Sequence, residues 1–130
     1  MVLDTSAMVA LLGMESEAER LAVAIESDPI RLVSAATVVE TGIVIEARYG
    51  ADGGRELDLL VAKADLQIEA VTLEHARVAR EAWRRFGKGH HAAALNLGDC
   101  FSYALAKTSG EPLLFKGTDF SQTDVLAVAY

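Results

Sequence analysis

The sequence is poor in cysteine and proline and has no long apolar run, and each shortage excludes a class of protein. A single cysteine, Cys100, among 130 residues leaves no internal disulfide and no cysteine-rich zinc site. Two prolines and 52% hydrophobic residues are typical of a folded domain rather than a disordered chain. No uninterrupted apolar run approaches the roughly 18 residues of a membrane span, and no basic region of a secretory signal opens the chain. We therefore expect a soluble, cytoplasmic protein that does not bind a membrane.

Positive charge is also scarce. Twelve Lys and Arg residues against 19 Asp and Glu residues give a formal net charge of −7. A general electrostatic attraction to nucleic acid is therefore disfavoured, and a polyanionic substrate would need a local basic patch or bound cations. The length suits one domain with its own core, so we expect residues 1–130 to form a single domain.

Short apolar segments alternate with helical patterns along the chain. Strands are expected at residues 1–3, 30–33, 66–71, 112–116 and, as a short last strand, 125–128. Helices are expected at residues 7–12, 16–25, 35–49, 55–64, 73–86 and 98–107. A loop is expected at residues 50–54, whereas residues 88–96 give no clear pattern. This alternation predicts an α/β fold with a mostly parallel sheet covered by helices.

Four acidic residues stand at positions that suit a functional site. Asp4 follows the first predicted strand and Asp119 the fourth, so parallel strands would bring both to the edge of the sheet where ligands gather. Asp99 lies in the first turn of a helix, where the macrodipole favours negative charge. Glu40 shares a helix face with apolar residues such as Ile43. An ionised carboxylate on a core-facing stripe is costly unless it is neutralised, paired or bound to a cation.

If these four carboxylates converge, each pair about 5 Å apart would repel by about 3 kcal/mol at an effective dielectric of about 20. A hard cation such as Mg²⁺, or Mn²⁺ in its place, would remove this repulsion and could activate a water molecule for attack on a phosphodiester. Ser6 and Thr118, each close to a candidate acid, serve either as capping hydroxyls or to orient a metal ligand. The sequence leaves open the number of metal ions and whether Asp119 or Asp124 is the fourth acid.

Four segments that carry these acids resemble, in order, the motifs of the PIN domain family, and specifically the VapC-type ribonuclease toxins of prokaryotic toxin–antitoxin pairs. The segments are Val2–Ala7, Ser34–Glu40, Leu97–Ala104 and Phe115–Phe120. The resemblance implies a three-layer PIN-like α/β/α domain and a metal-dependent endoribonuclease with the metal ligands Asp4, Glu40, Asp99 and Asp119. It also implies an RNA substrate, a cognate antitoxin that covers the active site, and a homodimer.

Nearly half of the basic residues lie in one segment. Four of them are spaced three, four and four residues apart and so share one helix face: Arg77, Arg80, Arg84 and Lys88. We interpret this basic stripe as a contact for RNA phosphates beside the metal site, although a solvated helix face would have the same pattern. Trp83 lies on the apolar face of the same helix and is interpreted as a core residue rather than a base-stacking platform.

Two other functions fit the acidic pattern. A Mg²⁺-dependent phosphatase or phosphoacceptor domain would form an aspartyl phosphate on Asp4 or Asp119. A haloacid-dehalogenase-like phosphatase, however, would have a second aspartate where Ser6 stands. The other alternative is a non-catalytic PIN-like binding module. The presence of all four acids argues against it. Cys100 is expected to be a buried apolar residue rather than a nucleophile.

Overall fold

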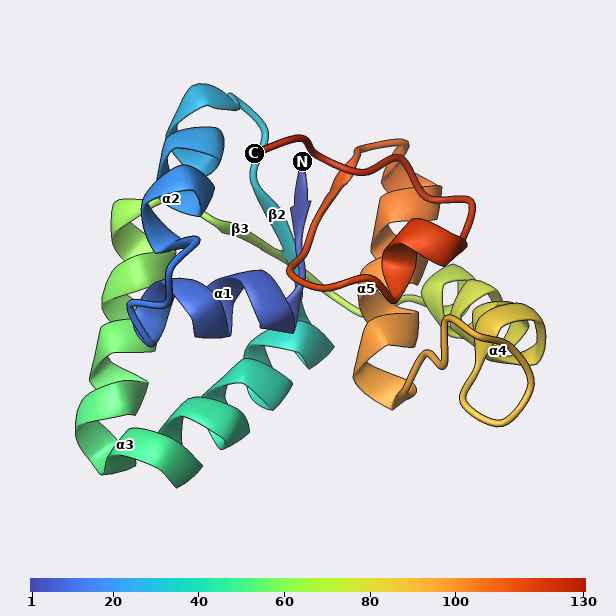
Figure 1. Ribbon diagram of the computed structural model, residues 1–130, viewed down its shortest axis with the longest axis horizontal. Helices are drawn as coiled ribbons and strands as arrows, with labels where there is room; N and C mark the ends of the chain where they lie inside the picture. Colours follow the sequence, from blue (N-terminus) through green and yellow to red (C-terminus); the bar gives the residue numbers. More distant parts are fainter.

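A parallel sheet of four short strands runs through the centre of the computed structural model, which describes residues 1–130 (Figure 1). The strands are β1 (Val2–Leu3), β2 (Leu32–Ser34), β3 (Gln67–Glu69) and β4 (Leu113–Leu114). Their spatial order is β3-β2-β1-β4, and all three pairings are parallel, with Val2 opposite both Leu32 and Leu113. The predicted α/β class and parallel sheet are confirmed.

Helices cover both faces of this sheet, as expected for three layers. They are α1 (Thr5–Leu12), α2 (Ala18–Ser27), α3 (Ala35–Lys63), α4 (Leu73–Phe86) and α5 (Leu97–Ser109), with a short 3₁₀ helix η1 (Phe120–Gln122) near the end. Figure 1 shows α1, α2 and most of α3 on one side of the sheet and α4 and α5 on the other. None of these helices combines the length and the apolar character needed to cross a membrane.

The core is divided in two by the sheet. Val2 packs into a cluster formed with α4 and α5, whereas its neighbour Leu3 packs into a second cluster formed with α1, α2 and α3. The strands β2 and β4 show the same alternation. Because successive side chains of a strand point to opposite faces, short apolar strands supply both cores at once. Cys100 is buried in the first cluster, as predicted.

The structure differs from the sequence-based prediction in three segments. The expected loop at residues 50–54 is reduced to a kink at Gly50, whose φ of 66° is readily adopted only by glycine, and residues 51–54 belong to the helical part of α3 after the kink. The expected last strand is reduced to one parallel bridge between Leu113 and Ala127. The edge strand β3 is shorter than expected and mostly exposed. Residues 88–96, which gave no clear pattern, form turns closed by a bridge between Gly87 and Leu95.

Parallel strands bring their carboxyl ends to one edge of the sheet, and helices begin there. The Asp4 side chain caps α1 by accepting a hydrogen bond from the backbone of Ser6, and the Ser34 side chain caps α3 by accepting one from Ala36. The amino terminus of α5 is capped by Asn96. These caps fix where the three helices that carry the candidate acids start.

Candidate active site

Asp4 is buried at the carboxyl end of β1, with 2% of its surface exposed. Its Oδ2 accepts hydrogen bonds from the backbone N–H of Ser6 at 2.9 Å and from the Ser6 hydroxyl at 2.6 Å. The Ser6 hydroxyl oxygen accepts in turn from the backbone N–H of Lys116 at 2.9 Å. The other oxygen, Oδ1, is buried and has no hydrogen-bond partner. A buried carboxylate oxygen without a partner is costly, and a cation with oxygen ligands would supply one.

Glu40 reaches from α3 to the amino-terminal ends of α1 and α5. Thr5 Oγ1 donates a hydrogen bond of 2.6 Å to Glu40 Oε2. The neighbouring Thr41 hydroxyl donates to the Thr37 carbonyl at 2.8 Å. The carboxylate lies directly against Gly98, where an added Cβ would collide with both carboxylate oxygens. Any larger residue at this position would displace the Glu40 carboxylate from where it lies in the structure.

The expectation that Glu40 lies on a core-facing stripe of its helix is wrong. Ile43, a member of the predicted stripe, is 66% exposed. The buried face of this part of α3 carries Thr37, Thr41 and Ile45 instead. Two threonines on the buried face weaken the apolar periodicity, so the sequence pattern placed the core about one residue away from its position in the structure.

Asp99 forms a capping box at the start of α5. Its Oδ2 accepts a hydrogen bond from the backbone N–H of Asn96 at 2.8 Å, and Asn96 Oδ1 accepts from the backbone N–H of Asp99 at 2.9 Å. The pKa of Asp99 is raised to about 7, mainly by burial and also by three nearby negative charges, while the hydrogen bond from Asn96 acts in the opposite direction. The three charges are those of Asp4, Glu40 and Asp119. The charges of the other three candidate acids therefore all reach Asp99.

Asp119 and Asp124, the two candidates for the fourth acid, have different surroundings. Asp119 is exposed at the start of η1, makes no capping hydrogen bond, and adds its charge to the field described above. Asp124 accepts a hydrogen bond from the Tyr103 hydroxyl at 2.6 Å. It also forms ion pairs with Arg85 at 3.3 Å and Lys107 at 3.4 Å. Asp124 thus belongs to a network that ties the carboxyl-terminal segment to α4 and α5.

The charges of three candidate acids act on the fourth, Asp99, but the four carboxylates do not surround a common centre. No three acidic, histidine or cysteine side chains lie close enough together to form a ready-made metal cage. Carboxylates without a counter-ion repel one another, so a cation would have to draw them inward. The unpartnered Oδ1 of the buried Asp4 is the fixed donor around which the others could gather. An all-oxygen donor set of this kind fits Mg²⁺ or Mn²⁺ rather than zinc.

The two hydroxyl residues expected to support the acids differ in their contacts. Ser6 holds the Asp4 carboxylate in place, as described above. Thr118 is exposed and its hydroxyl forms no hydrogen bond; only its carbonyl oxygen does so, accepting from the Ser121 hydroxyl. The structure therefore provides a positioning contact for Ser6 and none for Thr118.

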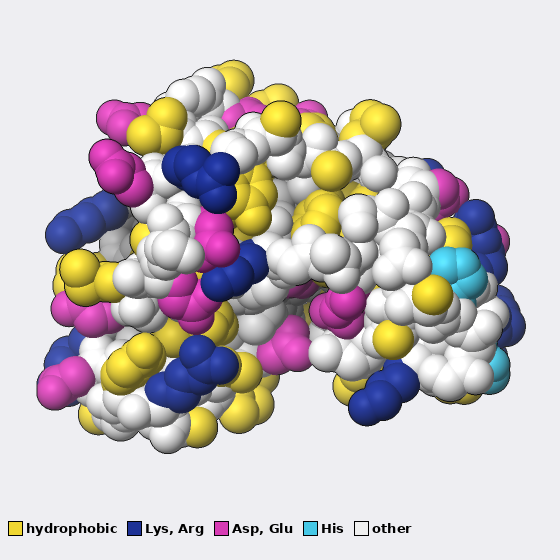
Figure 2. Space-filling view, in the orientation of Figure 1, with side chains coloured by type: hydrophobic (Ala, Val, Ile, Leu, Met, Phe, Trp, Pro, Cys, Tyr) yellow, Lys and Arg dark blue, Asp and Glu magenta, His cyan; other side chains and the backbone are white.

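The predicted basic stripe lies on the surface of the molecule. All four residues are exposed, and none forms an ion pair within the chain: Arg77, Arg80, Arg84 and Lys88. The prediction that Trp83 is a core residue is wrong, because it is 45% exposed and lines a groove between α4 and α5. Figure 2 shows Asp and Glu side chains around a hollow between the two halves of the molecule, with basic side chains on either side of it.

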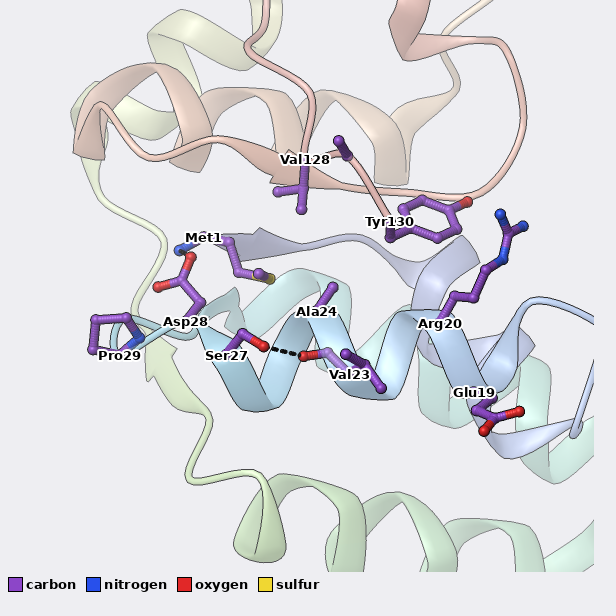
Figure 3. A pocket seen from close by; sticks show the side chains of 11 residues that line it. Met1, Glu19, Arg20, Val23, Ala24, Ser27, Asp28, Pro29, Val128 and Tyr130 are labelled. Atoms are coloured by element: carbon purple, nitrogen blue, oxygen red, sulfur yellow. Dashed lines mark hydrogen bonds and ion pairs between the residues drawn. The ribbon is translucent and has the colours of Figure 1, made fainter.

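A cavity of about 700 Å³ lies elsewhere, between α2 and the carboxyl-terminal segment. Arg20 extends from α2 toward the ring of Tyr130 there, with its guanidinium carbon 5.6 Å from the ring centre, while Val128 points toward α2 (Figure 3). Met1 also lines this cavity, which places it at the amino ends of the strands. It is therefore separated by the length of the sheet from the four candidate acids.

Sequence reasoning missed Thr5 and Gly98, the two residues that contact the Glu40 carboxylate. Thr5 directly follows Asp4 and precedes the helix predicted at residues 7–12, and its sequence context indicates no contact with Glu40. Gly98 offered a signal, because glycine inside a helix costs about 1 kcal/mol relative to alanine and so indicates a packing or functional reason. That reason is the position of the Glu40 side chain.

We expect Thr5→Val to lower metal-dependent activity about tenfold, because valine keeps the shape of threonine but removes the donor to Glu40 Oε2. The loss should consist mainly of a higher metal concentration required for half-maximal RNA cleavage, the activity proposed below. Thr5→Ser, which retains the hydroxyl, should restore most of the wild-type metal dependence. An unchanged metal dependence in Thr5→Val would show that the contact with Glu40 has no positioning role.

Comparisons with known proteins agree with this geometry. The profile of the PIN domain family matches residues 1–126. Ribonuclease VapC30 of Mycobacterium tuberculosis is 57% identical over 129 residues, which cover 99% of this chain and 98% of that protein. The crystal structure of Mycobacterium tuberculosis VapC20, described as a sarcin–ricin loop cleaving toxin, superimposes with a TM-score of 0.81 at 21% identity, covering 99% of this chain and 98% of that one.

A second solved structure with the same fold is a toxin–antitoxin complex from Klebsiella pneumoniae. It has a TM-score of 0.73 at 18% identity and covers 99% of this chain and 97% of the matched chain. The family profile and the VapC30 match both extend over nearly the whole chain, including all four segments that carry the acids. The chain therefore belongs to the PIN domain family and, within it, to the VapC ribonucleases.

Proposed function

We propose that this protein is a metal-dependent endoribonuclease and the toxin of a toxin–antitoxin pair. The single observation that carries the proposal is the buried, unpartnered Oδ1 of Asp4. It is accompanied by Asp99, whose pKa is raised to about 7 by burial and, to a smaller extent, by the charges of the other three acids. Such a group of carboxylates suits the binding of a metal cation better than a chain of hydrogen bonds that transfers protons. The relative named Ribonuclease VapC30 supports RNA as the substrate.

The metal ligands in this proposal are Asp4, Glu40, Asp99 and Asp119. Mg²⁺ is the proposed ion, with Mn²⁺ able to substitute; when bound, it would supply an activated water molecule and neutralise charge that develops on the phosphodiester. Ser6 fixes the orientation of Asp4, and Asn96 holds one oxygen of Asp99. Each of these contacts leaves the other carboxylate oxygen of the acid free of hydrogen bonds within the chain.

The phosphatase interpretation loses support in this structure. Ser6, at the position where a haloacid-dehalogenase-like phosphatase has its second aspartate, instead donates a hydrogen bond to Asp4. The interpretation as a binding module loses support because the other three candidate acids lie close enough for their charges to act on Asp99. Neither alternative accounts for the close relative named as a ribonuclease.

Two protein partners form part of the proposal. We infer a cognate antitoxin, in keeping with the Klebsiella pneumoniae complex that shares the fold. We also infer a homodimer, since α3 exposes the apolar side chains of Val39 and Ile43 on either side of Glu40 along the helix. Light scattering on the purified protein tests the dimer. The cytoplasmic location stays a prediction.

The test of the proposed activity is incubation of purified protein with total cellular RNA in the presence of Mg²⁺, Mn²⁺ or excess EDTA. We expect discrete RNA fragments with either metal and none with EDTA, because the acids repel one another and the phosphodiester unless a cation is bound. Cleavage that persists in EDTA would contradict the metal dependence. RNA binding without cleavage under both metal conditions would favour the binding module.

A further inference from the structure

The buried polar side chains of this protein are concentrated in one region. They lie at the carboxyl ends of β1 and β2 or in the first two turns of α3 and α5: Asp4, Ser34, Thr37, Thr41 and Ser102. Asp4 is a candidate metal ligand and Ser34 caps α3, so their burial is already explained. The other three carry hydroxyl groups, which are costly to bury unless they form hydrogen bonds. Their partners therefore indicate what they do.

Thr37 and Ser102 form a hydrogen bond with each other from two different helices. Their hydroxyl oxygens are 3.1 Å apart, and both residues are completely buried, with 0% of their surface exposed. The Thr41 hydroxyl, in contrast, donates to the carbonyl of Thr37 within its own helix. The Thr37–Ser102 pair is the only side-chain hydrogen bond that joins α3 to α5.

This pair lies one helical turn from two candidate acids. Thr37 precedes Glu40 by three residues on α3, and Ser102 follows Asp99 by three residues on α5. One turn further along α3, the Glu40 carboxylate lies against Gly98 of α5. The contacts advance along α3 and go back along α5, so the two helices pass each other in opposite directions. Glu40 and the first turn of α5 lie at one end of this contact, directly beside the Thr37–Ser102 pair.

Repulsion between carboxylates acts against this arrangement of the two helices. The negative charge of Glu40 reaches Asp99, and carboxylates without a cation repel one another. An apolar contact at this place would hold α3 and α5 together without fixing their relative position, because the hydrophobic effect has no direction. A hydrogen bond has a preferred length and angle. The Thr37–Ser102 pair therefore fixes α3 against α5 at the turn next to the acids.

We propose that Thr37 and Ser102 are positioning residues, which hold α3 and α5 at the separation from which Glu40 and Asp99 reach one metal ion. Neither hydroxyl touches the metal or the RNA; both act through the placement of the helices. Loss of either hydroxyl should therefore weaken metal binding more than it disturbs the fold. This inference rests on the metal binding of the proposed function, and it assigns to two buried residues the preparation of the site before the ion binds.

The experiment measures Mn²⁺ binding without RNA, well below the melting temperature. Electron paramagnetic resonance reports the free ion, whose signal decreases as Mn²⁺ binds. We expect Ser102→Ala and Thr37→Val each to raise the Kd for Mn²⁺ about tenfold, at the lower end of the effect of losing an outer contact of a metal site. The double variant should bind no more weakly than the single variants, because each of them already lacks the same hydrogen bond. Thr37→Ser keeps the hydroxyl and should bind Mn²⁺ as the wild type does.

Thr108→Val is the matched control for a purely structural effect. The Thr108 hydroxyl also belongs to α5, but it donates to the carbonyl of Ala104 in the same helix at 2.9 Å and does not reach α3. Its loss should lower the Tm in EDTA while the Kd for Mn²⁺ stays at the wild-type value. In Ser102→Ala, by comparison, the Kd should rise by far more than in a Thr108→Val protein with an equal loss of Tm.

The outcomes distinguish this inference from the proposed function. Equal Mn²⁺ affinity of the wild type and Ser102→Ala would overturn the positioning role and leave the metal-dependent function intact. An equal loss of affinity in Thr108→Val would also overturn it, because weaker binding would then follow from lower stability alone. Failure of the wild-type protein to bind Mn²⁺ would contradict the metal-dependent function itself, and this inference with it.

Discussion

Asp99→Asn is expected to lower the rate of RNA cleavage on the order of a thousandfold. Asp119→Asn is expected to lower the same rate. Both substitutions remove a negative charge that the cation needs and leave the side chain nearly unchanged in shape. A thousandfold loss of rate is about what is seen when an enzyme loses one group that stabilises charge on the reacting atoms. The measurement is the single-turnover rate on a labelled RNA with saturating Mg²⁺, with circular dichroism confirming that each variant is folded.

Asp124→Asn is the matched control for this prediction. Asp124 is also an exposed aspartate of the carboxyl-terminal segment, but its partners are Tyr103, Arg85 and Lys107 rather than the acids. We expect Asp124→Asn to lower thermal stability while the cleavage rate well below its melting temperature stays within about twofold of wild type. An inactive Asp124→Asn beside an active Asp119→Asn would show that the fourth acid is Asp124.

The sequence predicted the parts of the site that follow from the ends of strands. Asp4 and Asp119 were placed at one edge because parallel strands end together, and the four-stranded parallel sheet bears this out. Ser34 and Thr72 directly precede two of the predicted helices and cap them in the structure. Helix capping depends on residues next to one another in the sequence, and the shared edge depends on the order of strands and helices along the chain. Both can be read from a single sequence.

The features that the sequence did not predict depend on contacts between distant segments. Thr5 and Glu40 are 35 residues apart, and nothing in either helical pattern indicates their hydrogen bond. Trp83 was placed in the core because it lies on the apolar face of α4, but α5 covers only part of that face and leaves a groove. Amphipathic periodicity gives the direction of a helix face, whereas the packing partner decides how much of that face is buried.

Without metal, the protein should become less stable as the pH rises from about 4 to about 7. The pKa of Asp99 is raised from its ordinary value of 3.8 to about 7 in the folded state, so the folded state holds this proton more tightly than the unfolded state does. The free energy of unfolding therefore includes a favourable contribution that is fully present below about pH 4 and is lost as the pH rises through 7. Between pH 5 and pH 8 the expected loss is about 2 kcal/mol, or roughly 6 °C in Tm, after allowing for partial screening by solvent.

Thermal unfolding in EDTA at pH 5 and pH 8 tests this expectation, with Asp99→Asn as the reference. The asparagine variant cannot ionise, so it should show a smaller loss of Tm across the same range and should melt above the wild type at pH 8. Addition of Mg²⁺ at pH 8 should raise the Tm of the wild type, because the cation binds the ionised carboxylates and competes with the proton. The same addition should have little effect on Asp99→Asn. Equal pH dependence of the two proteins in EDTA would mean that ionisation of Asp99 does not destabilise the folded protein. Repulsion among the carboxylates would then be relieved already before a cation binds.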